Sequence, residues 1–438
     1  MKDKKPILVL GLGKTGVSVV KYLLKKQESF CIFDQHKSPS GLIEIQRLVK
    51  EEDIFLEEFE IETLSKYGQI IVSPGIKPNN EVILKSLKLK IPVITDFDIF
   101  FSETSSMIIL ITGTNGKSTV VSMLERVLKD TYDKLLISSG GNIGKPVLEL
   151  LQDDPVISVL EISSFQLQLT KKIQSDISLL LNLKEDHLDW HKNLDEYHKA
   201  KKRVFENSDV MLSSDNILEE NSSIIKFSTF LDKYSNFITA RIDKVRTEHD
   251  KLNIMAVLTA LIYIAKLRSG ISIDDEVKIH SILSSAIKSL NNFSSLPHRF
   301  ERLGVINEIL YIDDSKATNT DSAVKAIESV SILYPDKEVI LICGGESKGQ
   351  SFTDLAEVCI GKIKEVFLIG KDSNILYKYL SPKIKTLIVP DLRDAILKAK
   401  LSSNPGSIIL FSPACSSLDM YKDYEQRGNE FKRLSGFN

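Results

Sequence analysis

The sequence predicts an α/β protein with three domains and mainly parallel sheets. Short apolar runs alternate with helical patterns along the whole chain, and this alternation is typical of α/β folds. Polar or glycine-rich turns follow many of these runs, as expected at the carboxyl ends of parallel strands. The 438 residues are enough for several hydrophobic cores. The expected strands span 7–10, 30–33, 70–72, 107–111, 156–160, 177–183, 309–312, 339–343, 366–369 and 407–411.

Two segments, 95–98 and 296–300, each precede a fresh strand-rich stretch and divide the chain. We therefore expect domains at 1–95, 96–297 and 298–438. The first and last are predicted to be Rossmann-like. The central domain is predicted to be P-loop ATPase-like, for the reasons given below.

The N-terminal domain opens with a glycine turn, Gly11-Leu12-Gly13-Lys14-Thr15-Gly16, directly after the first strand, and Asp34 ends the second strand. This is the fingerprint of a dinucleotide-binding βαβ unit, in which the turn holds a pyrophosphate and the acid binds a ribose hydroxyl. The same turn can hold the pyrophosphate of any nucleotide. A second turn, Ser73-Pro74-Gly75, is expected at the same sheet edge, although a simple chain reversal explains it equally well.

The central domain carries the most informative segment of the chain. An apolar strand, 107–111, runs into a glycine-rich turn, and a helical pattern follows at 120–128. Backbone N–H groups of such a turn and the helix N-terminus hold phosphate oxygens. Lys117 would reach the β- and γ-phosphates of ATP, and Ser118 or Thr119 could bind Mg²⁺. The predicted ATP-binding residues of the turn are Gly113, Thr114, Asn115, Gly116, Lys117, Ser118 and Thr119.

Further candidates in the central domain lie where other strands end. Glu161 ends the strand 156–160, and in a parallel sheet it would lie beside the phosphate-binding turn, where it could bind Mg²⁺. His187 follows two acids after the strand 177–183 and is a candidate metal ligand. The loop 140–144 exposes backbone to a ligand. Composition alone suggests that the basic run 199–203 is the solvated face of a helix.

The third domain repeats this pattern with different residues. Polar loops 313–319, 344–348 and 412–417 each follow an apolar strand. Parallel strands bring such loops to one edge of a sheet. ATP does not account for this edge, and we expect it to bind a second, anionic substrate.

Bulk properties exclude several classes of protein. A formal net charge of −2 argues against binding to nucleic acid or an anionic membrane through bulk charge. The four cysteines show no metal-ligand spacing, as expected for reduced cytosolic thiols. No apolar stretch is expected to span a membrane. We expect a cytoplasmic monomer that acts on small molecules.

Six motifs together resemble the Mur ligase family of bacterial cell-wall synthesis along the whole chain. They are GTNGKST at 113–119, LEISSFQL at 160–167, LPHRF at 296–300, DSKATN at 314–319, SPACSSLD at 412–419 and YEQRGNEF at 424–431. The resemblance implies an ATP-dependent amide ligase that adds D-glutamate to UDP-N-acetylmuramoyl-L-alanine. An acyl phosphate would be the intermediate, and ADP and phosphate would be released.

The resemblance also implies roles for individual residues. The catalytic residues would be Lys117, His187, Lys201 and Lys316, with Lys201 matching a lysine that family members carbamylate. Two Mg²⁺ ions would be held by Ser118, Glu161, His187 and carbamylated Lys201. Further ATP contacts would be Asn253, His298, Arg299 and Asp314. The UDP substrate would contact Gly13, Lys14, Thr15, Asp34, Ser73, Gly75 and Asn142, and D-glutamate would contact Thr318, Lys348, Ser417 and Tyr424.

The sequence departs from the family pattern at three places. Asp250 stands where an asparagine is usual, Tyr424 where phenylalanine is common, and Gln35-His36 where Thr-Arg is common. Alternatives to the D-glutamate ligase are another ligase of the Mur or folylpolyglutamate synthase type, a nucleotide-dependent oxidoreductase and a regulatory nucleotide switch. The oxidoreductase would leave the turn 113–119 unexplained, and the switch would leave the third domain without a use.

Overall fold

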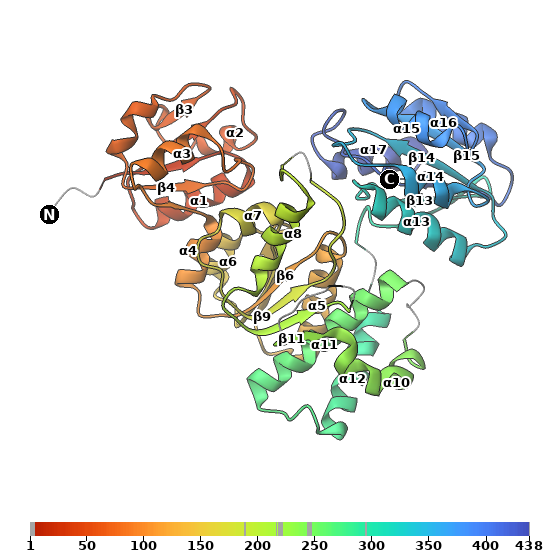
Figure 1. Ribbon diagram of the computed structural model, residues 1–438, viewed down its shortest axis with the longest axis horizontal. Helices are drawn as coiled ribbons and strands as arrows, with labels where there is room; N and C mark the ends of the chain where they lie inside the picture. The colour runs from red at the N-terminus through yellow and green to blue at the C-terminus, as the bar shows by residue number, and fades with distance from the viewer. Residues whose placement is uncertain are drawn as a thin grey trace. The chain divides into compact units, whose positions relative to one another are not determined.

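The computed structural model describes residues 5–187, 190–215, 217, 222–242, 248–293 and 296–437. The chain forms two compact units. The first unit comprises Met1–Leu183, His198–Arg241 and Met255–Leu290, and the second comprises Lys184–Tyr197, Ile242–Ile254 and Asn291–Asn438. The structure contains three sheets with the helices that pack on them (Figure 1).

The first sheet has the strand order β3-β2-β1-β4-β5, with every pair parallel, and is the expected Rossmann-like sheet. Its strands are β1 (Ile7–Leu10), β2 (Phe30–Asp34), β3 (Ile54–Leu56), β4 (Gln69–Val72) and β5 (Val93–Ile94). Its helices are α1 (Lys14–Lys25), α2 (Leu42–Ile45) and α3 (Glu81–Lys88). Because β4 lies next to β1, the turns that follow these two strands lie at one edge.

The second sheet, also in the first unit, has the order β11-β10-β9-β6-β8-β7 and is entirely parallel. Its strands are β6 (Met107–Thr112), β7 (Ile137–Gly141), β8 (Ile157–Glu161), β9 (Ser175–Leu180), β10 (Ser208–Ser213) and β11 (Ile224–Lys226). The helices of this region are α4 (Asp96–Glu103), α5 (Lys117–Thr131), α6 (Val147–Asp153), α7 (Ser164–Leu169), α8 (Leu194–Lys202), α9 (Phe227–Leu231), α10 (Ser235–Thr239), α11 (Glu248–Ser269) and α12 (Glu276–Asn291).

The third sheet, in the second unit, has the order β12-β13-β17-β14-β15-β16, and only the pair β12–β13 is antiparallel. Its strands are β12 (Glu301–Ile306), β13 (Ile309–Asp313), β14 (Val339–Gly344), β15 (Glu365–Ile369), β16 (Thr386–Ile388) and β17 (Ile408–Phe411). Its helices are α13 (Thr320–Leu333), α14 (Thr353–Cys359), α15 (Ser373–Leu380), α16 (Leu392–Ser402) and α17 (Tyr424–Ser435). The strands β13, β17 and β14 are neighbours, so their polar loops share one edge, as predicted.

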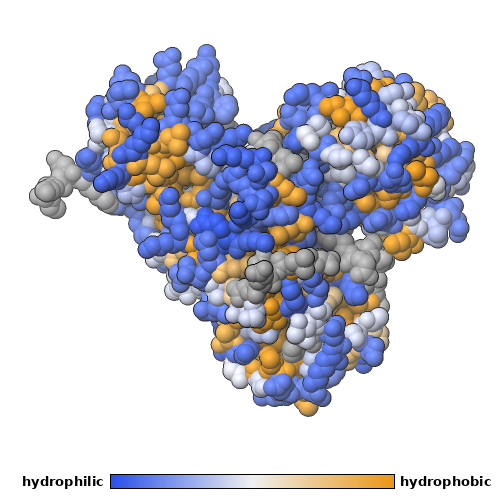
Figure 2. Space-filling model, in the orientation of Figure 1, coloured by the Kyte–Doolittle hydropathy of each residue, from blue (hydrophilic) through white to orange (hydrophobic). Residues whose placement is uncertain are grey.

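Apolar residues of the central strands are almost fully buried and form the cores beneath these edges. The face in Figure 2 is mainly hydrophilic, with scattered apolar groups. Among the described residues, one helix segment, Asp250–Ser269, is long and apolar enough to span a membrane by length and composition, although no such stretch was expected from the sequence. Most of that segment is buried inside the protein, as in the core helix of a soluble fold.

Three expected elements had boundaries that were wrong by more than one residue. The strand expected at 177–183 ends at Leu180, so the segment that leads to His187 is loop. The helix expected at 120–128 begins already at Lys117, because Gly116 caps it with a φ of 84°. That left-handed conformation favours glycine, which lets the chain turn sharply from β6 into α5. Gly140 and Gly141, expected in a loop, belong to β7.

Candidate functional site

The turn predicted to bind phosphate connects the buried strand β6 to the helix α5. Lys117 is the first residue of α5, and its Nζ donates hydrogen bonds to the carbonyl oxygens of Gly113 and Thr114, both at 2.9 Å. The first N–H groups of a helix have no partner within the helix and carry its partial positive charge. The turn therefore offers a lysine and a helix N-terminus at one place, which suits a triphosphate.

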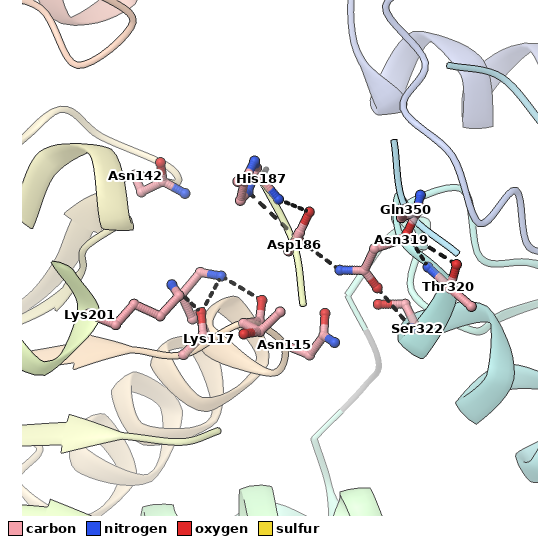
Figure 3. A network of polar contacts seen from close by, with 12 residues as sticks. Asn115, Lys117, Asn142, Asp186, His187, Lys201, Asn319, Thr320, Ser322 and Gln350 are labelled. Atoms are coloured by element: carbon pink, nitrogen blue, oxygen red, sulfur yellow. Dashed lines mark hydrogen bonds and ion pairs between the residues drawn. The ribbon is translucent and has the colours of Figure 1, made fainter. Parts of the chain in front are cut away.

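A second lysine reaches the same turn. Lys201 lies near the end of α8 with only 2% of its surface exposed, and its Nζ donates to the carbonyl oxygen of Gly113 at 2.8 Å (Figure 3). The prediction from composition that this basic run faces solvent was wrong for Lys201, whereas Lys199 is exposed as expected. Burial makes a charged ammonium costly. A buried lysine at a phosphate site is therefore suited to a functional role.

A carboxylate lies beside the turn, as the sequence predicted. Because β8 is parallel to β6 and pairs Ile111 with Glu161, the carboxylate at the end of β8 lies at the start of α5. Ser118 Oγ donates to Glu161 Oε2 at 2.6 Å, and Asn142 Nδ2 donates to Glu161 Oε1 at 2.7 Å. Glu161 is 1% exposed. A hydroxyl and a carboxylate are oxygen donors of the kind that Mg²⁺ prefers, so the donor set fits this ion.

The glycine turns of the N-terminal sheet are held by side chains. Asp34 Oδ2 accepts from the N–H of Leu12 at 2.7 Å, and its Oδ1 accepts from the N–H of His36 at 2.8 Å. Ser73 Oγ donates to the carbonyl oxygen of Gly11 at 3.0 Å, which ties the two turns together. A Cβ atom added to Gly13 or Gly75 would meet nothing within 4 Å, so these two positions leave room for a ligand.

One contact joins the first glycine turn, 11–16, to the glycine-rich segment 140–144 within the first unit. Lys14 Nζ, at the start of α1, donates to the carbonyl oxygen of Gly144 at 2.6 Å. Gly144 lies just beyond Asn142 in the chain, and Asn142 binds Glu161. Thr15 follows in the first turn of α1. The structure thus brings part of the predicted UDP site close to the loop that touches the predicted metal ligand.

In the second unit, His187 belongs to a polar cluster. Its backbone is left-handed, with a φ of 55°, and its N–H donates to Asp186 Oδ1 at 2.8 Å. Asp186 Oδ2 accepts from Asn319 Nδ2 at 2.8 Å (Figure 3). Burial raises the pKa of Asp186. However, the charge of His187, the hydrogen bond from Asn319 and the charge of Lys348 together hold this pKa below its usual value.

The predicted nucleotide contacts of the third domain cluster around two aspartates. His298 Nδ1 lies 2.7 Å from Asp313 Oδ2. Asp314 accepts hydrogen bonds from Ser412 Oγ at 2.8 Å and from the N–H of Phe300 at 3.1 Å. The positive charge of Arg299 also interacts with the Asp314 carboxyl group. Burial raises the pKa of Asp314 to about 7. Asn253 Oδ1, in α11, is buried and has no hydrogen-bond partner among the described residues.

The loops after β13, β14 and β17 hold the remaining predicted residues. Lys316 Nζ lies 4.9 Å from the ring centroid of Tyr424, the first residue of α17. Lys348 has a left-handed backbone, with a φ of 52°. Thr318 and Ser417 lie in the loops after β13 and β17. The edge combines two lysines with hydroxyl groups, which suits a small substrate that carries carboxylates.

Two buried residues that hold loops of the predicted site in place were assigned no role from the sequence. Arg427 of α17 is fully buried, and its Nη2 donates to the carbonyl oxygens of Ser315 and Cys415, at 2.9 and 3.0 Å. It therefore links the loops after β13 and β17. Asn182, after β9, binds Asn115 of the phosphate-binding turn. Arg427 lies inside the motif 424–431 and Asn182 lies just after β9, but the residue type alone does not predict a role for either.

Models of known families match most of the chain. They describe the N-terminal domain of MurD-like Mur ligases at residues 5–95, the Mur ligase middle domain at 111–261 and the Mur ligase glutamate ligase domain at 298–415. A UDP-N-acetylmuramoylalanine–D-glutamate ligase from Hahella chejuensis is 31% identical and covers 98% of this chain and 97% of its own. The enzyme of the same name from Nitrosococcus oceani is 32% identical, with 97% and 95% covered.

The chain belongs to the Mur ligase family. A third relative, the UDP-N-acetylmuramoylalanine–D-glutamate ligase of Buchnera aphidicola, is 34% identical, with 98% of each chain covered. Solved structures agree in fold. UDP-N-acetylmuramate-alanine ligase from Thermotoga maritima has a TM-score of 0.59 at 15% identity, with 98% of each chain covered. The MurF ligase from the same organism, in complex with ADP, has a TM-score of 0.54 at 16% identity, with 99% and 95% covered.

Proposed function

We propose that this Mur ligase joins D-glutamate to UDP-N-acetylmuramoyl-L-alanine with ATP, in the synthesis of peptidoglycan precursors. Chains that carry the name of this ligase are similar to it from end to end. The observation that carries the proposal is the buried cluster of Ser118, Glu161 and Asn142 at the turn that holds Lys117. Such a cluster serves ATP-dependent phosphoryl transfer and has no use in a nicotinamide enzyme.

Each of the three predicted domains is assigned one ligand. Residues 1–95 bind the UDP part of the substrate, 96–297 bind ATP, and 298–438 bind the amino acid. ATP is bound by the turn 113–119 together with Asn253, His298, Arg299 and Asp314. UDP-N-acetylmuramoyl-L-alanine is bound by Gly13, Lys14, Thr15, Asp34, Ser73, Gly75 and Asn142. D-glutamate is bound by Thr318, Lys348, Ser417 and Tyr424.

Mg²⁺ is the proposed cation, with two ions per active chain. Ser118 and Glu161 would hold one ion, and His187 with carbamylated Lys201 would hold the second. Bound Mg²⁺ would neutralise the phosphates and the substrate carboxylate, which otherwise repel each other. Carbamylation would turn the buried ammonium of Lys201 into an anionic oxygen ligand, and a bound Mg²⁺ would neutralise that charge at this 2% exposed position.

The chemistry begins with attack of the substrate's L-alanyl carboxylate on the γ-phosphorus of ATP. The bond from the γ-phosphorus to the bridging oxygen breaks, ADP leaves, and an acyl phosphate forms. Lys117 would stabilise the charge that spreads over the transferring phosphoryl group. The amine of D-glutamate then attacks the acyl carbon, phosphate leaves, and the amine loses a proton as the amide forms. Lys316, at the edge that holds the amino acid, would orient the groups for this second step.

Phosphate release tests the proposal. The full chain would be incubated with ATP, Mg²⁺ and UDP-N-acetylmuramoyl-L-alanine, together with D-glutamate, L-glutamate, L-lysine or no amino acid. We expect release only with D-glutamate, accompanied by an amide-linked product. Release with another amino acid would support the ligase chemistry but would change the assigned amino-acid substrate. No release in any mixture, from protein that is folded by circular dichroism, would refute the proposal.

We further propose that the enzyme works as a cytoplasmic monomer, since its substrates are nucleotides and amino acids of the cytoplasm. A folylpolyglutamate synthase-like activity is the second candidate. The match of the N-terminal domain to MurD-like Mur ligases at residues 5–95 favours the D-glutamate ligase over it. Size-exclusion chromatography with light scattering would test the monomer.

A further inference from the structure

The phosphate-binding turn is fastened to the strand next to β6 by one side chain, that of Asn182. Asn182 follows β9, lies in the first unit with the turn and is 8% exposed. Its Oδ1 accepts from the N–H of Asn115 at 2.9 Å, and its Nδ2 donates to the carbonyl oxygen of Asn115, also at 2.9 Å. One amide side chain thus pairs with both polar groups of one residue in the turn.

The backbone on both sides extends this contact. The N–H of Thr114 donates to the carbonyl oxygen of Asn182 at 3.1 Å, and the N–H of Leu181 donates to that of Thr112 at 2.9 Å. A Cβ atom added to Gly113 would lie 3.0 Å from Leu181 Cβ, so the two segments pack tightly there. The turn therefore continues the pairing of β6 and β9 beyond the strands, with the side chain of Asn182 as its last link.

This pairing determines which groups of the turn face the nucleotide. The N–H groups of Thr114 and Asn115 donate to Asn182, so these two groups are directed away from a nucleotide, and the N-terminus of α5 from Gly116 onward would supply backbone donors for ATP. The carbonyl oxygen of Gly113 accepts from both Lys117 and Lys201. A carbonyl that faced the phosphates would repel them, and the fixed turn keeps it directed at the two lysines instead.

We propose that Asn182 is a positioning residue for ATP: it holds the turn in the conformation that presents the N-terminus of α5 and Lys117 to the phosphates. It need not touch the nucleotide itself. The inference rests on the proposed assignment of the turn 113–119 to ATP. Its test must therefore separate a wrong assignment of the turn from a wrong role for Asn182.

The experiment compares four variants of the full chain with the wild type by isothermal titration with ADP and, separately, with UDP. Asn182→Ala removes both side-chain hydrogen bonds, and Asn182→Asp keeps the acceptor for the N–H of Asn115 but places a negative charge at the turn. Lys117→Met tests the turn itself. Asn80→Ala is the matched control, because Asn80 Oδ1 also accepts one backbone N–H, that of Val82 at 2.9 Å, in the first unit.

We expect Asn182→Ala to weaken ADP binding about tenfold, since two hydrogen bonds that order the loop are lost. Asn182→Asp should weaken ADP binding further, because the charge repels phosphate and the carboxylate cannot donate to Asn115. UDP affinity should change less than about twofold in both. The KM for ATP should rise in parallel, while the KM for D-glutamate stays near its wild-type value.

Thermal stability separates this role from a merely structural one. Asn182→Asp keeps one of the two bonds and the shape of the side chain, so its melting temperature should be at least that of Asn182→Ala, although it binds ADP less well. If Asn182 had only a structural role, the variant with the higher melting temperature would also bind ADP more tightly, and that result would overturn the inference. Unchanged ADP affinity in both Asn182 variants, with a loss in Lys117→Met, would also overturn it. If Lys117→Met binds ADP normally too, the assignment of the turn is wrong and the inference falls with it.

Discussion

A single methyl group placed on α17 should displace His298, a predicted nucleotide contact of the third domain, and destabilise that domain. A Cβ atom added to Gly428 would lie 2.2 Å from Nδ1 of His298 and 2.8 Å from two ring carbons. His298 is buried, and its Nδ1 lies 2.7 Å from Asp313. The substitution Gly428→Ala must therefore displace the imidazole ring from its carboxylate partner.

The magnitude follows from three terms. Alanine favours a helix interior over glycine by about 1 kcal/mol, which stabilises the variant. Loss of the bond between His298 and the Asp313 carboxylate costs roughly 1.5–3 kcal/mol, and the strain of overpacking costs roughly 1–3 kcal/mol. The net result is a destabilisation of about 1.5–5 kcal/mol. For a domain of this size, the corresponding transition should move down by roughly 5–15 °C.

Differential scanning calorimetry of the full chain measures this shift, since separate transitions are visible when a protein has several domains. Asn429→Ala, at an exposed neighbouring position of α17, is the matched control and should shift the transition little. The decisive comparison uses His298→Ala as a background. There the clash is gone, so adding Gly428→Ala should raise the transition temperature. A further loss of stability in that background would show that the clash with His298 is not the cause.

Three further predictions concern other groups. Glu161→Gln should lower kcat about a hundredfold and raise the Mg²⁺ concentration needed for half-maximal rate, while UDP affinity stays constant; an unchanged Mg²⁺ requirement would remove Glu161 from the metal site. Burial raises the pKa of Asp96 from 3.8 to about 7, so the folded state holds a proton that the unfolded chain has lost, and stability falls as pH rises through that window. The wild type should therefore lose up to about 4 kcal/mol of unfolding free energy between pH 4 and pH 8, and Asp96→Asn should not show this loss in urea unfolding at each pH. Parallel curves of unfolding free energy against pH for variant and wild type would contradict this. Arg427→Met removes the bonds to Ser315 and Cys415 but also two buried nitrogen donors, Nε and Nη1, that have no hydrogen-bond partner among the described residues. It should therefore change the melting temperature little and raise the KM for D-glutamate about tenfold; an unchanged KM would refute a link between Arg427 and the amino-acid site.

The sequence predicted what depends on local pattern and on the geometry of parallel sheets. Short apolar runs marked the strands, and residues at strand ends had to meet at common edges. Glu161 lies beside the turn for this reason, since its strand β8 pairs with β6. The loops after β13, β14 and β17 share an edge for the same reason.

Features that depend on packing between distant segments were not predictable. Lys201 lies in a basic run that composition assigns to solvent, yet α8 buries it against a turn many residues earlier in the chain. Arg427 is fully buried, although arginine is rarely buried completely. Asn182 became informative only when both of its contacts to Asn115 were known. The roles of the individual site residues, and the domain boundaries, remain predictions.

The central claim is that ATP activates the L-alanyl carboxylate of the UDP substrate as an acyl phosphate. It is tested most directly by labelling that carboxylate with oxygen-18 and adding ATP, Mg²⁺, D-glutamate and the enzyme. If the acyl phosphate forms, one labelled oxygen must leave with the phosphate, and mass spectrometry will find oxygen-18 in the inorganic phosphate at one atom per amide formed. Amide formation with unlabelled phosphate would contradict the mechanism.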